Sequence, residues 1–169
     1  MILTKKEILK EIKLKRVKIV PYDPKAVGPA SIDLTLDNKI REFVSPEIPI
    51  PVKENADYKK YSKLVKIKKG FLLQPGKMVL GITKEKIHLP NDVAGWLQSR
   101  SRYARIGLMS HSTAPFILPG VENHQILEIF NAGSHDLLLI PGEKICQLVL
   151  QRCEGSAKYK GKFKDQTLK

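Results

Sequence analysis

The 169-residue sequence predicts a single, mainly β domain with one helix at its N-terminus. Many short apolar runs are each closed by proline or glycine, as expected for strands that end in turns. Helical spacing of apolar residues is clear only near the start of the chain. A chain of this length can bury roughly 70% of its unfolded surface, and 42% of its residues are hydrophobic, so a globular core needs no disulfide. Many short strands at close spacing favour a sandwich or a barrel.

The N-terminal helix is predicted over residues 5–14. Thr4 and Glu7 have the spacing of a capping box, in which each side chain bonds the other residue's backbone N–H. Ile8 and Ile12 follow one helical turn apart, so one face of the helix is apolar. This pattern indicates a short amphipathic helix that packs one face on the sheet.

The runs that predict strands are 30–36, 39–44, 64–67, 71–73, 77–83, 93–97, 125–131, 136–140 and 144–151. The proline-rich stretch 45–62 interrupts them and predicts a long loop. We therefore expect one domain over residues 1–155, followed by a basic tail over 156–169 that buries little.

The formal net charge of +13 indicates a polyanionic partner, such as a nucleotide or a nucleic acid. Most lysines are spread along the chain, and the density is higher only in residues 1–20 and 156–169. A nucleic-acid-binding β domain is the weaker reading, because no row of stacking aromatics accompanies the charge. There is no signal peptide and no apolar run near the ~20 residues that span a bilayer, so we expect a soluble, cytoplasmic protein.

Glu128 is the first candidate for chemistry. In a strand over 125–131 it shares a face with Ile126 and Phe130, while Leu127 and Ile129 take the other face. Desolvation in such an apolar stretch disfavours the charged form of a carboxyl, which suits a group that takes and returns a proton near neutral pH. The competing reading, of equal weight from the strand alone, is an edge glutamate that faces water or pairs with lysine.

The segment SRSRYARIGL, residues 99–108, is the second candidate. If a short helix or turn begins near Ser99, Ser101 and Arg105 fall one turn apart on one face, and Gly107 can end the helix. Backbone N–H groups, hydroxyls and a forked guanidinium make a site for an anion. An exposed basic turn is the alternative.

Signatures of several other enzyme classes are missing from the sequence. Zinc-dependent nucleobase deaminases need a Pro-Cys-x-x-Cys segment, whereas Cys146 and Cys153 stand seven residues apart. The four histidines have no ligand spacing, so we expect no protein-bound metal and no zinc. Walker, dinucleotide-binding and nucleophile-elbow motifs are also missing.

Taken together, the motifs resemble those of the dCTP deaminase branch of the dUTPase-like superfamily. The segments that carry the resemblance are PASIDLTL (29–36), LQPGKMVLGITKEKIHLPNDVAGWL (73–97), SRSRYARIGL, HSTAPFILPG, QILEIFNAG, LIPGEKICQLVLQRC and AKYKGKF. The resemblance implies a distorted jelly-roll-like, dUTPase-type β fold and a homotrimer with sites between subunits. It also implies zinc-independent hydrolysis of the cyclic amidine C–N bond of dCTP, with Mg²⁺ on the triphosphate and dUTP and ammonia as products.

The resemblance also assigns roles to residues. Glu128 matches the catalytic glutamate, and Ser101 and Arg105 match its serine and arginine partners. The matched substrate-binding positions are Arg100, Arg102, Thr113, Ala114, Gln147, Lys158, Tyr159 and Lys162. Thr113 and Ala114 stand where the family's backbone meets the base, and Lys158 and Tyr159 belong to the tail that closes over the triphosphate.

The chain departs from the family pattern at two of these places and at two others, Leu118 and Asn123, the latter near a position where the family usually has glycine. Arg102 replaces a serine, and Lys162 replaces a tail glutamine. Leu118 stands where the family commonly has an aspartate that contacts the deoxyribose and, in phosphate-cleaving members, activates water. Leu118 therefore speaks against a dUTP diphosphatase or a bifunctional enzyme, and it keeps open a non-catalytic nucleotide-binding protein.

Overall fold

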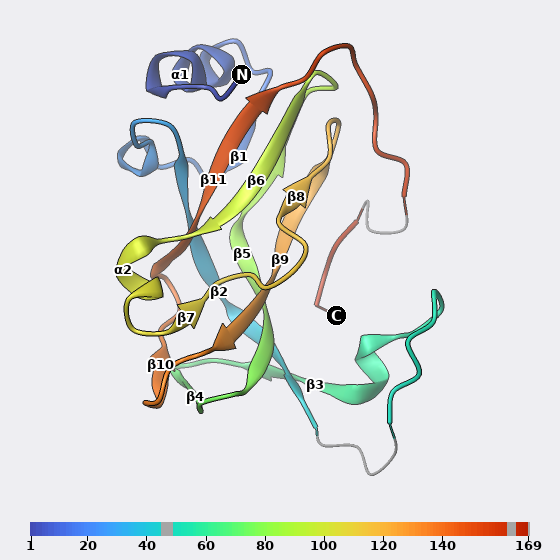
Figure 1. Cartoon of the computed structure of the whole chain (residues 1–169). Coiled ribbons are helices and arrows are strands. Elements are labelled where there is room, and N and C mark those ends of the chain that lie inside the picture. Colours follow the sequence, from blue (N-terminus) through green and yellow to red (C-terminus); the bar gives the residue numbers. More distant parts are fainter. Residues whose placement is uncertain (45–48, 162–164, 169) are drawn as a thin grey trace.

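The body of the protein is a strongly curled antiparallel sheet of nine strands, seen in a computed structural model that describes residues 1–44, 49–161 and 165–168 (Figure 1). Its central path runs β7-β9-β5-β2-β11-β6-β8, with β1 paired to β5 and β3 to β2. These strands are β1 (Lys18–Val20), β2 (Ile32–Phe43), β3 (Ser62–Lys66), β5 (Met78–His88), β6 (Val93–Ser99), β7 (Leu108–Met109), β8 (Phe116–Ile117), β9 (Glu122–Asn131) and β11 (Lys144–Arg152). A separate two-stranded sheet pairs β4 (Phe71–Leu73) with β10 (Leu137–Leu139).

The long strand β2 connects the two halves of the curled sheet. Its first residues pair with β11, for example Ile32 with Leu148, and its later residues pair with β5 and β3. The register shifts between Leu36 and Ile40, at the point where the partner changes. Because one strand serves both halves, their apolar faces enclose a common core that includes Leu34, Ile40, Leu127, Ile129 and Leu148. This mainly β architecture with an N-terminal helix agrees with the predicted fold class.

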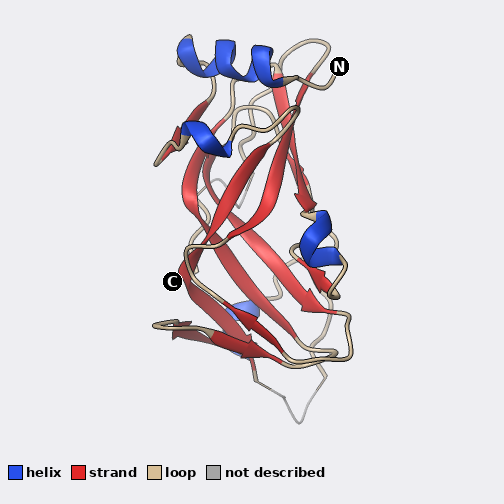
Figure 2. Cartoon of the chain, turned by 90° about the vertical axis from the view of Figure 1, so that its left-hand side faces the viewer, coloured by secondary structure: helices blue, strands red, loops and turns tan. Residues whose placement is uncertain are grey.

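The helix α1 (Lys5–Lys13) lies across one end of the sheet, as Figure 2 shows. Buried Glu11 fixes it there, accepting hydrogen bonds from Arg16 Nε (2.7 Å) and Arg152 Nη2 (2.8 Å). Arg16 also donates to both oxygens of Asp92. Burial raises the pKa of the Glu11 carboxyl, but the hydrogen bonds from Arg152 and Arg16 outweigh it, so the net pKa is below its ordinary value.

The predicted helix and the longer predicted strands are observed, whereas the short strands β1, β7 and β8 were not predicted. Three further differences concern the predicted elements themselves. Thr4 is the N-cap of α1, but its side chain makes no capping hydrogen bond, so the capping box is wrong. The two runs 30–36 and 39–44 form the single strand β2. β5 continues past residue 83 because Thr83 and Glu85 are buried with partners: Thr83 Oγ1 donates to the Glu85 carbonyl, and Glu85 accepts from the Thr35 N–H.

The predicted loop 45–62 lies partly outside the described residues, and its last part forms the 3₁₀ helix Tyr58–Tyr61. A second 3₁₀ helix spans Pro24–Ala26. The tail folds back along the sheet (Figure 1). Near its end Leu168 is only 2% exposed and packs on Leu80 and Ile82. Leu168 is the one buried residue in the described part of the tail, which otherwise buries little, as predicted.

Candidate active site

Glu128 lies on the open face of β9, opposite the core. Leu127 and Ile129 are fully buried on the inner face, so the strand alternation turns Glu128 outward, where it is half-buried. It pairs in register with Leu80 of β5. The predicted strand and its face assignment are therefore correct.

Four donors from the loop between β7 and β8 converge on one oxygen of this carboxylate. Glu128 Oε2 accepts from the Thr113 N–H at 2.7 Å, Thr113 Oγ1 at 3.1 Å, the Ser112 N–H at 3.2 Å and the Ala114 N–H at 3.4 Å. Ser112 Oγ also donates to the Glu128 carbonyl at 3.0 Å. The loop thus fixes the rotamer of the carboxylate. Among the described residues no donor lies on Oε1, which leaves this oxygen for water or substrate.

The carboxylate opens into a cavity of about 640 Å³. Its walls are mainly apolar and include Phe116 and Leu118, while Thr113, Tyr159 and Gln166 add polar groups. Leu118 is 39% exposed, so its side chain is available to a bound molecule. An apolar cavity with a few convergent polar groups is typical of a small-molecule site.

His111 lines the same cavity. Burial lowers the pKa of its imidazole, against a smaller opposing effect of the Glu128 charge. Its Nδ1 is buried and has no hydrogen-bond partner among the described residues. The ring is therefore predominantly neutral at neutral pH and does not add a cation beside Glu128.

The serine–arginine group lies elsewhere on the protomer. The short helix α2 (Ser101–Ala104) carries Ser101, and Arg105 follows as its C-cap, with both side chains exposed. Gly107 ends this turn in the left-handed region at φ +87°. Neither Ser101 nor Arg105 lines the cavity of Glu128 in the same chain.

The other predicted phosphate ligands gather near α2. Arg100 donates to the Lys144 carbonyl at 2.7 Å and pairs with Asp33 at 3.1 Å, and Gln147 accepts from Ser31 Oγ. Arg102 is exposed on α2, while Lys162 lies outside the described residues. One protomer thus brings Glu128, Thr113, Ala114 and Tyr159 together, and it presents Ser101, Arg105, Arg100, Arg102 and Gln147 on a different surface.

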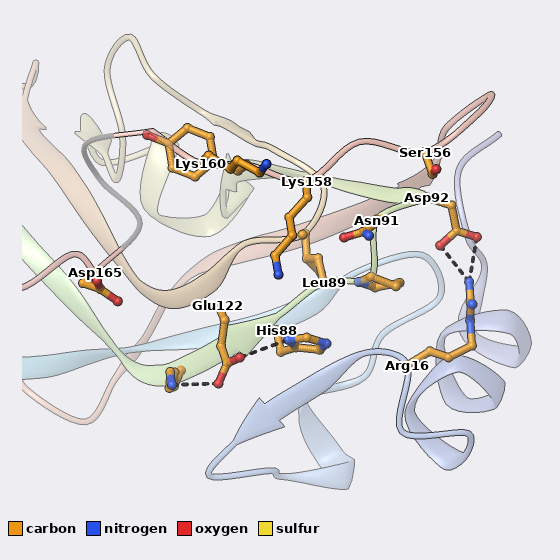
Figure 3. Close-up of a pocket in the computed structure, with 14 residues that line it drawn as sticks. Arg16, His88, Leu89, Asn91, Asp92, Glu122, Ser156, Lys158, Lys160 and Asp165 are labelled. Carbon is orange, nitrogen blue, oxygen red and sulfur yellow. Dashed lines mark hydrogen bonds and ion pairs between the residues drawn. The ribbon is translucent and has the colours of Figure 1, made fainter.

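The tail borders a second cavity of about 1100 Å³, shown in Figure 3. It shares Tyr159 with the first cavity. Lys158 points from the tail toward the His88–Glu122 pair, and Lys160 lies on the same segment. The Tyr159 N–H donates to the Pro119 carbonyl, and its side chain lines both cavities. A molecule bound at Glu128 therefore has a second, charged cavity on the far side of Tyr159, to which the tail contributes Lys158 and Lys160.

Two further properties bear on function. Over residues 1–44, 49–161 and 165–168, no three His, Cys, Asp or Glu side chains gather where they could hold a metal ion. Within the same residues, no helix combines the length and the apolar character needed to cross a membrane.

Comparison with known proteins decides the family. A family model described as dCTP deaminase-like matches residues 2–153. The chain belongs to this family. A relative from Clavibacter michiganensis subsp. michiganensis, named dCTP deaminase, dUMP-forming, is 40% identical over 160 residues, which cover 94% of this chain and 79% of the relative.

Two solved structures of other proteins share the fold. A 2′-deoxycytidine 5′-triphosphate deaminase from Agrobacterium tumefaciens superposes with a TM-score of 0.71 at 20% identity, covering 89% of this chain. This chain spans 48% of the Agrobacterium chain, or about half its length. A dUTPase from Staphylococcus bacteriophage 80alpha gives a TM-score of 0.52 at 14% identity, covering 86% of this chain and 96% of the phage chain.

Sequence reasoning did not find two of the residues that build the site. The N–H of Ser112 joins the group that holds Glu128, and Gln166 forms part of the cavity wall. Ser112 belongs to the motif HSTAPF, and its position next to Thr113 was the only signal in the sequence that pointed to a role in the site. Gln166 stands in a tail without periodicity, and no pattern in the sequence indicates its place.

Proposed function

We propose that this protein deaminates the cytosine ring of dCTP by hydrolysis and releases ammonia. The observation that carries the proposal is the Glu128 carboxylate, anchored through Oε2 by the 112–114 loop at the wall of a 640 Å³ cavity. An anchored carboxylate with a second, unbonded oxygen can exchange protons with a bound water. The relatives named dCTP deaminase supply the substrate class.

In the proposed reaction Glu128 Oε1 takes a proton from water, and the hydroxide attacks C4 of the ring. The carboxyl returns this proton to N3, then takes the second proton from the new C4 hydroxyl and passes it to the amine. The C4–N bond breaks, ammonia leaves, and a C4 carbonyl forms. General acid–base catalysis of this kind contributes typically ~10²–10⁴ in rate, and positioning supplies more. The apolar walls around Glu128 favour a nearly dry site for these steps.

We further propose a homotrimer, in which Ser101 and Arg105 of a neighbouring copy complete the site. The support is their exposure on α2, outside the cavity of their own chain. Arg105 would orient water and carboxylate, and Arg100, Arg102 and Gln147 of the same copy would bind phosphate oxygens. Forked guanidinium groups suit that role because they form paired bonds to phosphate.

The magnesium ion of the proposed reaction belongs to the substrate. Mg²⁺ is commonly bound through substrate phosphates with few protein carboxylates. Lys158, with Tyr159 at the boundary of the two cavities, would face the same phosphates. A cytoplasmic location stays a prediction from the sequence.

For the product we propose dUTP. By the family resemblance, residue 118 is the position of the aspartate that activates water in phosphate-cleaving members. This chain has Leu118 there, in the cavity wall, so it has no carboxylate at that position to act as the base for hydrolysis of the triphosphate. The second candidate is dUMP, which is favoured by the names of the relatives. A non-catalytic nucleotide-binding protein is the remaining alternative.

One experiment separates these candidates. The protein is incubated with dCTP, and separately with dUTP, in the presence of Mg²⁺, and all nucleotides, ammonia and pyrophosphate are quantified. Conversion of dCTP to dUTP and ammonia supports the proposal. Release of pyrophosphate with dUMP supports the second candidate, and tight binding of dCTP without any conversion identifies a non-catalytic protein.

A further inference from the structure

The last described segment, residues 165–168, is bound to the protomer's own body beside the cavity of Glu128. Leu168 is buried against Leu80 and Ile82, and Tyr58 Oη donates to the Thr167 carbonyl at 3.4 Å. Gln166 is half-buried and lines the same cavity as Glu128. The end of the chain therefore forms part of the cavity wall.

Arg41 anchors this segment from the interior. It is 8% exposed, and its Nε donates to the Leu168 carbonyl at 2.8 Å. Its Nη1 donates to the Ser62 carbonyl at 2.8 Å and to Ser62 Oγ at 3.1 Å. A buried guanidinium is costly unless its donors are satisfied, so undocking of Leu168 would leave Nε without that acceptor. This cost favours the docked position of the segment.

Gln166 bonds to the free edge of β9. The Gln125 N–H donates to Thr83 Oγ1 on the β5 side, so the next N–H, that of Ile126, points to the opposite edge. There it donates to Gln166 Oε1 at 3.3 Å. An edge N–H needs such an acceptor, and this bond fixes which end of the Gln166 amide faces the strand.

The remaining polar group of Gln166 is its amide Nε2, which carries two donor hydrogens. Ile126 precedes Glu128 by two residues, or about 7 Å along a strand. That displacement is close to the separation between the reacting C4 of a pyrimidine and its sugar ring. A 2′-deoxyribose esterified at its 5′ oxygen has one free hydroxyl, at the 3′ position, and a hydroxyl oxygen accepts hydrogen bonds.

From these contacts we infer that Gln166 Nε2 donates a hydrogen bond to the 3′-hydroxyl of the nucleotide, within a wall that Arg41 and Leu168 hold in place. The inference rests on the proposed function, because the position of the base at Glu128 sets that of the sugar. The side chain of Leu118, in the same cavity wall, offers no polar atom to the sugar. Gln166 is thus a specificity-determining residue that recognises an unmodified 3′ position.

The test compares dCTP with 2′,3′-dideoxy-CTP, which has the same base and triphosphate but no 3′-hydroxyl. For the wild type we expect kcat/KM to be about three- to tenfold higher with dCTP, the range of one neutral hydrogen bond. Gln166→Met and Gln166→Leu both remove the amide donors and leave no polar atom at this position for the 3′-hydroxyl. Both variants are expected to show a ratio near one. The shared base and triphosphate cancel any effect of the variants on those parts of the nucleotide.

Leu168→Ala tests the anchor without removing the buried guanidinium, and we expect it to lower the ratio as well. Thr167→Ala is the matched control, since that exposed side chain lies outside the cavity, and its ratio should stay at the wild-type value. A wild-type ratio of one, or Gln166 variants that keep the wild-type ratio, would overturn the inference. If the wild type converts neither nucleotide, the proposed function fails. The inference about Gln166 is then decided by calorimetry, as the ratio of the dissociation constants of 2′,3′-dideoxy-CTP and dCTP, with the same expected values for the wild type and the variants.

Discussion

Replacement of Glu128 by glutamine removes the proposed proton carrier while it preserves the shape of the side chain. The amide oxygen can accept the same donors as Oε2, at 2.7 Å from the Thr113 N–H and 3.1 Å from Thr113 Oγ1. Bonds to a charged acceptor are about twice as strong as neutral ones, so weakening these two costs about 1–2 kcal/mol. For a domain of this size that cost corresponds to a fall in Tm of about 2–8 °C.

The effect on catalysis should be far larger. The amide cannot take a proton from water, so kcat for ammonia release from dCTP should fall by at least about 10²–10⁴, while the Kd for dCTP changes by less than about threefold. Coupled ammonia detection and titration calorimetry measure the two quantities. Glu42→Gln, which removes an exposed carboxylate paired with Lys63 at 3.0 Å, is the control and should leave both unchanged. Undiminished turnover in Glu128→Gln would refute the assignment of the proton carrier.

Four further measurements test other parts of the structure. Wild-type protein with dUTP should give no pyrophosphate, since Leu118 cannot activate water; clear release would contradict this. Deletion of residues 157–169 should raise KM for dCTP, and unaltered kinetics would limit the tail to solubility. Gly107→Ala should cost at least about 1–3 kcal/mol in urea unfolding, because φ is +87° and a Cβ would lie 2.5 Å from neighbouring backbone. Glu11→Gln should reduce the loss of stability in acid. The folded-state pKa of Glu11 lies below the ordinary value of 4.5, so its carboxylate stabilises the fold fully above that value, and this stabilisation is lost as the pH falls through the folded-state pKa. The free energies of unfolding of the wild type and the variant at about pH 6 and about pH 3 would reveal the difference.

Local sequence was sufficient where the physical signal is local. The alternation of apolar residues around Glu128 predicts both the strand and the face of the carboxylate, because side chains of a strand alternate. The helical spacing of Ile8 and Ile12 predicts α1 for the same kind of reason. β5 runs past its apolar segment, since buried Glu85 and Thr83 also accept hydrogen bonds from the N–H groups of Thr35 and Gln125, distant residues that no local pattern reveals.

The tertiary structure decided three features of this protein: the order of the strands, the proximity of the 112–114 loop to Glu128, and the docking of Gln166 and Leu168. Each depends on contacts between residues far apart in the chain, such as that of Arg41 with Leu168. The sequence alone determined the β class, the terminal helix and the chemical character of the candidate residues, because these follow from neighbours along the chain. Which of those residues share a cavity follows from how β2 joins the two halves of the curled sheet, and no local spacing encodes that.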